Sequence, residues 1–196
     1  MHYISTMKTV FIKNIPVAGE VLYTELQNGF YIEASEGTSI RRLINVYCRI
    51  PDDYCSNKIK TIFHNSNPVD SPDDVKISYG SVCAISGAMP GLVGAMMRIG
   101  SPYASMRESI TEKGNDVSET GKTVLVRIKL FNVILSDLGE KFISSGVILS
   151  VESVLSVIGR IEEKIGGSFT LFLDGERLSS SKKNKLQDKM YIVKQC

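Results

Sequence analysis

The sequence predicts an α+β protein built from two lobes of one plan, each a mixed sheet crossed by one main helix. One observation is a repeat: Ile59–Gly87 aligns without a gap with Ser168–Cys196, at a constant offset of 109 residues. The alignment carries Asn65-Ser66 onto Asp174-Gly175, so turn residues repeat along with apolar ones. A second observation is that a stretch with helical apolar spacing precedes the aligned region in each half.

The second half shows the plan more clearly. Thr123–Phe131 alternates apolar with basic residues, which predicts a half-buried strand. Asp137-Leu138-Gly139 predicts a turn, and Phe142–Leu149 a second strand with Gly146 as a bulge. Ser150 is the expected cap of the main helix, which has apolar residues at Val151, Val154, Leu155, Ile158, Ile161 and Ile165.

The end of this half predicts a hairpin and a last strand. Phe169–Leu173 is the expected third strand, and Asp174-Gly175 is a dipeptide typical of a tight hairpin turn. Met190–Val193 is the expected last strand.

The first half repeats these elements in the same order. The expected strands are Lys8–Val10, Phe30–Ala34, Ile59–His64 and Ser81–Ile85. Thr38 or Ser39 is the expected cap of a helix whose apolar face holds Ile40, Leu43, Ile44 and Tyr47.

These elements predict a first lobe over residues 1–87 and a second over 122–196. Residues 88–121 between them combine a Gly/Met-rich segment with a polar linker, Arg107–Gly121. The alternative is one continuous α+β domain, but each half has its own strand–helix–strand set, which favours two lobes.

The pattern resembles the β-grasp, the ubiquitin-like fold, and most of all its sulfur-carrier branch, which includes the thiamine-pathway carrier and the small subunit of molybdopterin synthase. The motifs that carry the resemblance are Gly37-Thr38-Ser39, Ile62-Phe63-His64-Asn65, Tyr79-Gly80-Ser81-Val82, Val126–Phe131 and Phe172-Leu173-Asp174-Gly175.

The resemblance implies a carrier whose C-terminal Gly-Gly carboxylate is adenylated and converted to a thiocarboxylate. This sequence departs from that pattern, because its second half ends at Lys194-Gln195-Cys196. Carrier activity would therefore require processing after Gly87, Gly91 or Gly94.

Composition argues against several classes of protein. The 196 residues carry 23 basic and 21 acidic side chains, a balance that does not indicate nucleic-acid binding. No signal peptide and no membrane span are expected, since the most apolar stretch, Ile85–Ile99, is short and interrupted. Four cysteines and two histidines without ligand spacing predict no metal and no cofactor, including no iron–sulfur cluster, and reduced thiols in the cytoplasm.

The segment Ser86–Met106 is the candidate site, because it holds four of the seven methionines among several glycines and prolines. Methionine suits adaptable apolar contacts, and glycine permits close backbone approach. The predicted partner-binding residues are Met89, Pro90, Gly91, Leu92, Val93, Gly94, Met96, Met97 and Arg98. Arg98 and Arg107 are expected to contact an anionic group. The alternative is an apolar connector in which Leu92, Val93, Met96 and Ile99 fill the interface between the lobes.

The first functional hypothesis is a non-enzymatic tandem protein that acts by protein–protein contact or self-association through this segment. The second is a sulfur-carrier-like protein of molybdopterin or thiamine biosynthesis that requires processing. The third is small-molecule binding, with an unknown ligand, in an inter-lobe cleft around Arg98, His64 and Tyr103. A catalytic pair of His64 with Asp70, Asp73 or Asp74 is a minor alternative.

Overall fold

The computed structural model describes residues 7–13, 18–165, 169–178 and 186–195. It divides into two compact units. Unit 1 comprises Ile32–Asp137, and unit 2 comprises the chain up to Tyr31 together with the chain from Leu138. The boundaries of these units differ from the expected lobe boundaries, since the first strand and helix of the chain belong to unit 2.

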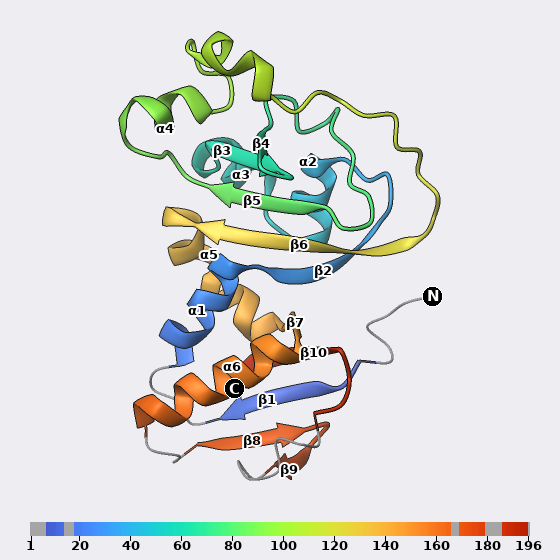
Figure 1. Ribbon diagram of the computed structural model, residues 1–196, viewed down its shortest axis with the longest axis vertical. Helices are drawn as coiled ribbons and strands as arrows, with labels where there is room; N and C mark the ends of the chain where they lie inside the picture. Colours follow the sequence, from blue (N-terminus) through green and yellow to red (C-terminus); the bar gives the residue numbers. More distant parts are fainter. Residues whose placement is uncertain (1–6, 14–17, 166–168, 179–185, 196) are drawn as a thin grey trace. The chain divides into compact units, whose positions relative to one another are not determined.

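Strands and helices are mixed in both units, in agreement with the predicted α+β class (Figure 1). The strands are β1 (Thr9–Lys13), β2 (Phe30–Ser35), β3 (Thr61–His64), β4 (Asn67–Pro68), β5 (Val82–Ser86), β6 (Thr123–Phe131), β7 (Val147–Ser150), β8 (Thr170–Leu173), β9 (Glu176–Leu178) and β10 (Met190–Gln195). The helices are α1 (Ala18–Asn28), α2 (Ile40–Arg42), the π-helical turn η2 (Leu43–Tyr47), α3 (Asp52–Lys58), α4 (Gly91–Met97), the 3₁₀ helix η3 (Ala104–Ile110), α5 (Asn132–Ser145) and α6 (Val151–Ile165).

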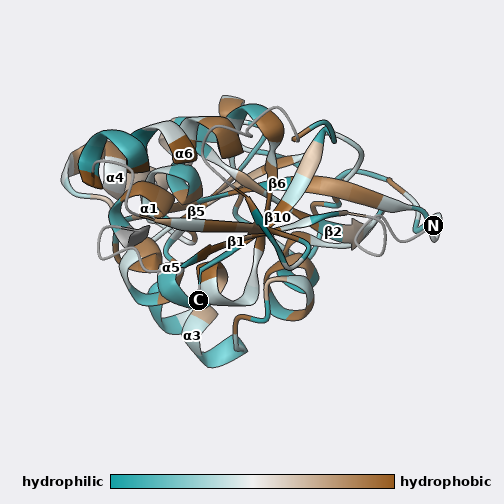
Figure 2. Cartoon of the chain, turned by 90° about the horizontal axis from the view of Figure 1, so that it is seen from below, coloured by the Kyte–Doolittle hydropathy of each residue, from teal (hydrophilic) through white to brown (hydrophobic). Residues whose placement is uncertain are grey.

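In unit 1 the hairpin β3–β4 lies beside β5, which runs antiparallel to β3 and parallel to β6. The part of β2 that belongs to this unit neighbours β6. β6 alternates buried and half-buried residues along its whole length, as the period-two pattern predicts, and buries Val124, Val126, Ile128 and Leu130. Figure 2 shows the contrast between these hydrophobic strands and the polar helix α3.

In unit 2 the hairpin β8–β9 lies beside β1, which runs antiparallel to β8 and parallel to β10. β10 in turn pairs antiparallel with β7, and Tyr31 at the start of β2 pairs with Ile148 of β7. The helix α6 packs across β7 and β10 (Figure 1). Its buried residues Val154, Val157, Ile158 and Ile161 form the apolar face that the helical spacing predicts.

The repeat of the hairpin is confirmed at the level of register. Phe63 pairs with Pro68 in unit 1, and Phe172 pairs with Arg177 in unit 2, at the same offset of 109. Both turns place two consecutive residues at positive φ, Asn65 and Ser66 in one and Asp174 and Gly175 in the other. Two positive φ values are the signature of a type I′ turn, which matches the twist of its strands.

The strand next to each hairpin comes from a different part of the chain. In unit 1 the Asn65 side chain accepts a hydrogen bond at 2.9 Å from the backbone N–H of Val82 in β5. In unit 2 the equivalent Asp174 side chain accepts one at 2.7 Å from Thr9 of β1. The offset alone would place Tyr191 of β10 there, so β1 holds in unit 2 the position that β5 holds in unit 1.

The predicted turn at Asp137-Leu138-Gly139 and the predicted strand beginning at Phe142 are wrong, because these residues lie in α5. Ile134, Leu138 and Phe142 are buried at helical spacing, and the ring of Phe142 lies 5.1 Å from that of Phe30. Gly146, expected to form a bulge, has φ of 98° and ends the helix, with its N–H bonded to the carbonyl of Phe142. Only the last three residues of the expected strand, 147–149, are extended, as part of β7 (Val147–Ser150).

The helical α5 also explains the placement of β6. A turn followed by a strand would have paired β6 with β7 as a hairpin. Instead β6 pairs in parallel with β5, with Cys83 opposite Ile128 and Ile85 opposite Leu130. All four of these side chains are fully buried, so β6 contributes its apolar face to the core of unit 1.

Candidate functional site

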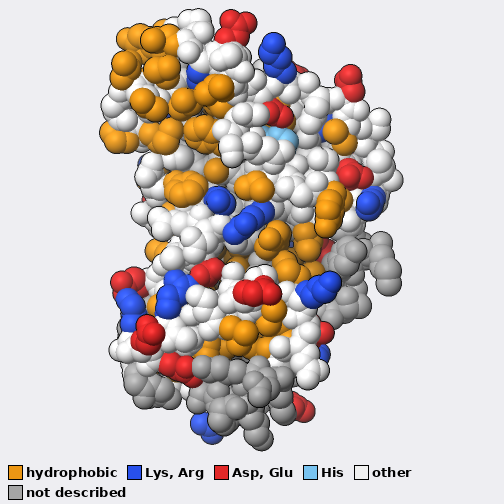
Figure 3. Space-filling model, in the orientation of Figure 1, with side chains coloured by type: hydrophobic (Ala, Val, Ile, Leu, Met, Phe, Trp, Pro, Cys, Tyr) orange, Lys and Arg blue, Asp and Glu red, His pale blue; other side chains and the backbone are white. Residues whose placement is uncertain are grey.

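Most of the large hydrophobic side chains that the described part of unit 1 exposes lie on α4, on η3 or at the N-cap of η3. Figure 3 shows hydrophobic side chains concentrated over α4. Nine large hydrophobic side chains are exposed among the described residues, and five of them lie between positions 92 and 110. We call these five the apolar patch: Leu92, Val93, Tyr103, Met106 and Ile110. Leu92 and Val93 are 62 % and 65 % exposed, so neither belongs to the core of unit 1.

Glycines shape the backbone that presents this patch. Gly91 begins α4 at φ of 77°, directly after the extended Pro90. Gly94 is buried, and a Cβ atom added to it would lie 2.2 Å from the carbonyl oxygen of Met89. Only glycine permits this approach, so the sequence folds Met89 back onto the helix and turns Leu92 and Val93 outward.

A buried arginine fixes η3 against the end of α4. The guanidinium of Arg107 is almost completely buried and forms a two-point ion pair with Asp70, with N–O distances of 2.7 Å and 3.0 Å. It also donates to the carbonyls of Met96 and Arg98, at 2.5 Å and 3.3 Å. These carbonyls lie at the end of α4, where no helical partner is available. Arg107 therefore holds the two helices of the patch in one arrangement.

The two arginines that were expected to contact an anionic group differ in burial. Arg98 is exposed and can reach a partner, whereas Arg107 is buried and already neutralised by Asp70. The assignment of Arg107 to an external anionic contact is wrong, because its five donors are directed to groups inside unit 1.

The structure places the other predicted site residues at different depths. Pro90, Gly91, Leu92 and Val93 are exposed, Met89, Met96 and Met97 are half-buried, and Gly94 is buried. The prediction missed Ile110 and did not include Tyr103 or Met106 among the partner-binding residues. Their spacing of three and four residues, typical of one helix face, is the signal that could have found them.

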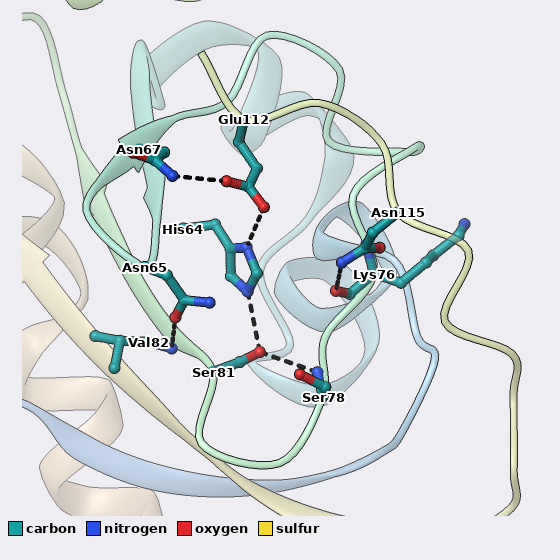
Figure 4. A network of polar contacts seen from close by, with 9 residues as sticks. All are labelled: His64, Asn65, Asn67, Lys76, Ser78, Ser81, Val82, Glu112 and Asn115. Atoms are coloured by element: carbon teal, nitrogen blue, oxygen red, sulfur yellow. Dashed lines mark hydrogen bonds and ion pairs between the residues drawn. The ribbon is translucent and has the colours of Figure 1, made fainter. Parts of the chain in front are cut away.

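A second polar cluster surrounds His64 in β3 (Figure 4). Its Nδ1 atom lies 3.3 Å from Glu112 and its Nε2 atom 2.9 Å from the hydroxyl of Ser81. Glu112 also accepts a hydrogen bond from Asn67 at 2.9 Å. The expected pairing of His64 with Asp70, Asp73 or Asp74 is wrong, because the two ring nitrogens of His64 contact Glu112 and Ser81 instead.

The order Glu–His–Ser resembles a hydrolytic triad, but the hydroxyl of Ser81 is not placed to attack a substrate. Ser81 is 1 % exposed, and its oxygen accepts a hydrogen bond from the backbone of Ser78 at 2.9 Å. A nucleophile must reach its substrate. Glu112 therefore serves to tie the segment after η3 to β3, and Asn115 continues this attachment through the backbone of Lys76.

Three cysteines are described, and all are buried thiols: Cys48, Cys55 and Cys83. Burial raises the pKa of Cys83 to about 12 and raises the pKa of Cys48 further. These two thiols therefore stay protonated at neutral pH and are unreactive. Cys196 lies outside the described residues.

Comparison with family models, with curated proteins and with solved structures finds no match for this chain. None of the helices that the structure describes has the length and apolar character needed to cross a bilayer. Within the same residues, no group of three or more His, Cys, Asp or Glu side chains is arranged to hold a metal ion.

Proposed function

We propose that this chain is a non-enzymatic tandem β-grasp protein that self-associates through the apolar patch on α4 and η3. The main observation in support is that more than half of the large hydrophobic side chains exposed by the described residues lie between positions 92 and 110 of unit 1. Scattered exposed hydrophobic residues are normal, but a contiguous group marks an interaction surface. Leu92, Val93, Tyr103 and Met106 are the residues expected to carry the contact.

The occupant that this surface fits best is a second copy of the chain. Between Ala88 and Ile110 the sequence contains three charged residues: the exposed Arg98 and Glu108, and the buried Arg107, which is paired with Asp70. A surface with so little net charge does not select a strongly charged partner. In a two-fold arrangement each Arg98 can face the Glu108 of the other copy, which makes the surface self-complementary.

The strand pairings support the β-grasp interpretation of both units. In each unit an antiparallel hairpin lies beside a central parallel pair, β5 with β6 in unit 1 and β1 with β10 in unit 2. A helix follows the strand on the other side of that pair, α2 after β2 and α6 after β7. A central parallel pair flanked by antiparallel neighbours is the arrangement expected for this fold, here with strands contributed from distant parts of the sequence.

Sedimentation velocity over a range of concentrations tests the proposal. The wild-type chain is expected to form dimers, and the double variant Leu92→Ser with Val93→Ser is expected to stay monomeric. Tyr79→Ser is the matched control, because Tyr79 is 80 % exposed but lies outside the patch. Dimers that persist in the double variant would contradict the role of the apolar patch in the contact. Monomers of the wild type at every concentration would contradict self-association and would leave a different protein as the candidate occupant.

A further inference from the structure

Unit 1 contains a half-open cavity of about 220 Å³ that is separate from the apolar patch. Its wall combines aliphatic side chains with polar ones: Ile44, Ile59, Ile62, Ile99 and Pro72 with Arg41, Asn45, Cys55, Ser56, Lys60 and Asp70. Such a volume holds about seven waters at the density of the liquid, so it fits a small molecule of comparable size. An apolar lining with a few polar groups is the usual composition of a ligand site.

Of the three charged side chains in the lining, two are in ion pairs and one is not. Asp70 is neutralised by Arg107 from behind, and Arg41 donates to Asp73 at 2.8 Å. Lys60 donates to the carbonyl of Ser56 at 2.8 Å and forms no ion pair with a described residue. The lining therefore contains two cations and one anion, and the anion already has a partner.

The positions of Lys60 and the isoleucines are fixed by the fold. Lys60 precedes β3, its N–H donates to Ser86 of β5, and its carbonyl accepts the N–H of Ile99 at 2.9 Å. Ile62 follows two residues later on β3, and Ile59 is the C-cap residue of α3. A cationic side chain thus lines a chamber whose isoleucines Ile44, Ile59 and Ile62 belong to the core of unit 1.

We propose that this cavity binds a small organic monoanion, a carboxylate with a short aliphatic body. Lys60 binds the carboxylate, with the free nitrogens of Arg41 as a second donor, and the isoleucines contact the aliphatic body. A monoanion balances the single unpaired positive charge of the lining, and burial of its aliphatic part adds the hydrophobic contribution. A larger, multiply charged phosphate compound does not match either the volume or the charge.

The thiol of Cys55 can report whether the cavity is occupied. Its thiol lines the cavity and lies 3.2 Å from the amide oxygen of Asn45, whereas Cys48 and Cys83 do not line it. A molecule seated in the cavity covers the thiol of Cys55 and leaves the environment of the other two unchanged.

The test uses the full chain with sodium salts of carboxylates from acetate to hexanoate, and butyramide as the uncharged analogue of butyrate, at constant ionic strength. At least one carboxylate is expected to raise the melting temperature saturably, because binding to the native state stabilises it. Butyramide is expected to give no comparable shift. Lys60→Met should weaken binding about tenfold or more, since one charge-assisted hydrogen bond is lost. Lys58→Met is the control, because Lys58 is exposed and does not line the cavity.

Alkylation of Cys55 by iodoacetamide, followed peptide by peptide, supplies a second readout in the wild-type chain. The effective carboxylate is expected to slow modification of Cys55 severalfold. No shift with any member of the series, an equal shift with butyramide, or unchanged binding in Lys60→Met would overturn the proposal. If Lys60→Met does not fold, the alkylation readout in the wild type decides: a rate at Cys55 that the carboxylate does not change would by itself overturn the proposal.

Discussion

The guanidinium of Arg107 binds the carboxylate of Asp70 through two hydrogen bonds, and this pair joins η3 to the loop after β4. Because Arg107 is 2 % exposed while also satisfying the last carbonyls of α4, it is the central support of the apolar patch. Arg107→Met keeps most of the length of the side chain but removes the partner of Asp70 and the side-chain donor to the carbonyl of Met96. We expect the free energy of unfolding, measured by urea denaturation, to fall by about 3 kcal/mol.

The control for this variant is Arg98→Met, which removes a nearby exposed charge and should change stability by less than about 0.5 kcal/mol. Equal effects of the two variants would show that the buried pair has no special importance for unit 1. Arg107→Lys should restore little, because an ammonium group cannot form the two-point contact with a carboxylate.

Gly94 is the second support of the patch. A Cβ atom there would meet the carbonyl of Met89 at 2.2 Å, so Gly94→Ala must displace backbone. We expect a loss of about 1–3 kcal/mol, typical of overpacking, and faster amide exchange in α4. Gly159 is the opposite case, because it lies within α6 and no atom is near the position of an added Cβ. Gly159→Ala should therefore stabilise the chain by up to about 1 kcal/mol. A Gly94→Ala variant as stable as wild type would show that Met89 can move freely.

Stability should depend on pH through the buried thiol of Cys83. Burial raises its pKa from 9.0 to about 12, so between these values the folded chain keeps a proton that the unfolded chain releases. The contribution of Cys83 to the free energy of unfolding is therefore constant below pH 9.0 and is lost as pH rises toward 12. The slope for one thiol is at most about 1.4 kcal/mol per pH unit. Denaturation at a series of alkaline pH values should show a smaller slope in Cys83→Ala, and identical slopes would contradict the assignment.

Asp174 should determine how firmly β1 is held in unit 2. Its carboxylate accepts the N–H of Thr9, and its φ of 50° is tolerated equally well by glycine. Asp174→Gly removes the side-chain contact without straining the turn. We expect faster amide exchange in Thr9–Lys13 and a loss of about 1 kcal/mol. The control is Glu176→Ala, at an exposed position of β9, which should leave amide exchange in β1 unchanged. Unchanged exchange in Asp174→Gly would show that other contacts hold β1.

Local signals in the sequence predicted local structure well. The strand Thr123–Phe131, the cap Ser150, one of the two alternative caps (Ser39) and the matching hairpin turns are confirmed. Each follows from side-chain period or turn chemistry within a few residues. Pairing between distant strands has no such signal. Nothing in the residues of β1 distinguishes a neighbour in β10 from one in β2, so the position of β1 beside β8 was not predicted.

The missed helices have a common cause. In α5 the sequence Asp137-Leu138-Gly139 has turn-forming residues, but Gly139 lies within the helix because the ring of Tyr23 packs against it, 2.8 Å from where a Cβ would be. The helix α1, which supplies Tyr23, was also not predicted, although Val21, Leu22 and Leu26 share one buried face. Close packing between two helices overrode a local turn preference that the sequence displays plainly.

The sequence pointed to the Gly/Met-rich segment as the candidate site, but it did not show what holds the two helices of that segment together. The Gly/Met-rich segment does expose Leu92 and Val93, and whether they bind a partner stays a prediction. The buried role of Arg107 depends on Asp70, which lies far away in sequence, so spacing could not reveal it.

Cross-linking through a single engineered cysteine tests self-association at the apolar patch most directly. Val93→Cys places a thiol at the most exposed position of the patch, and Tyr79→Cys places one on an exposed position elsewhere. Near a two-fold axis a residue meets its own copy, so we predict covalent dimers of Val93→Cys under mild oxidation, and few of Tyr79→Cys. Equal dimer yields from the two variants, or none from Val93→Cys at concentrations where the wild type associates, would contradict the account.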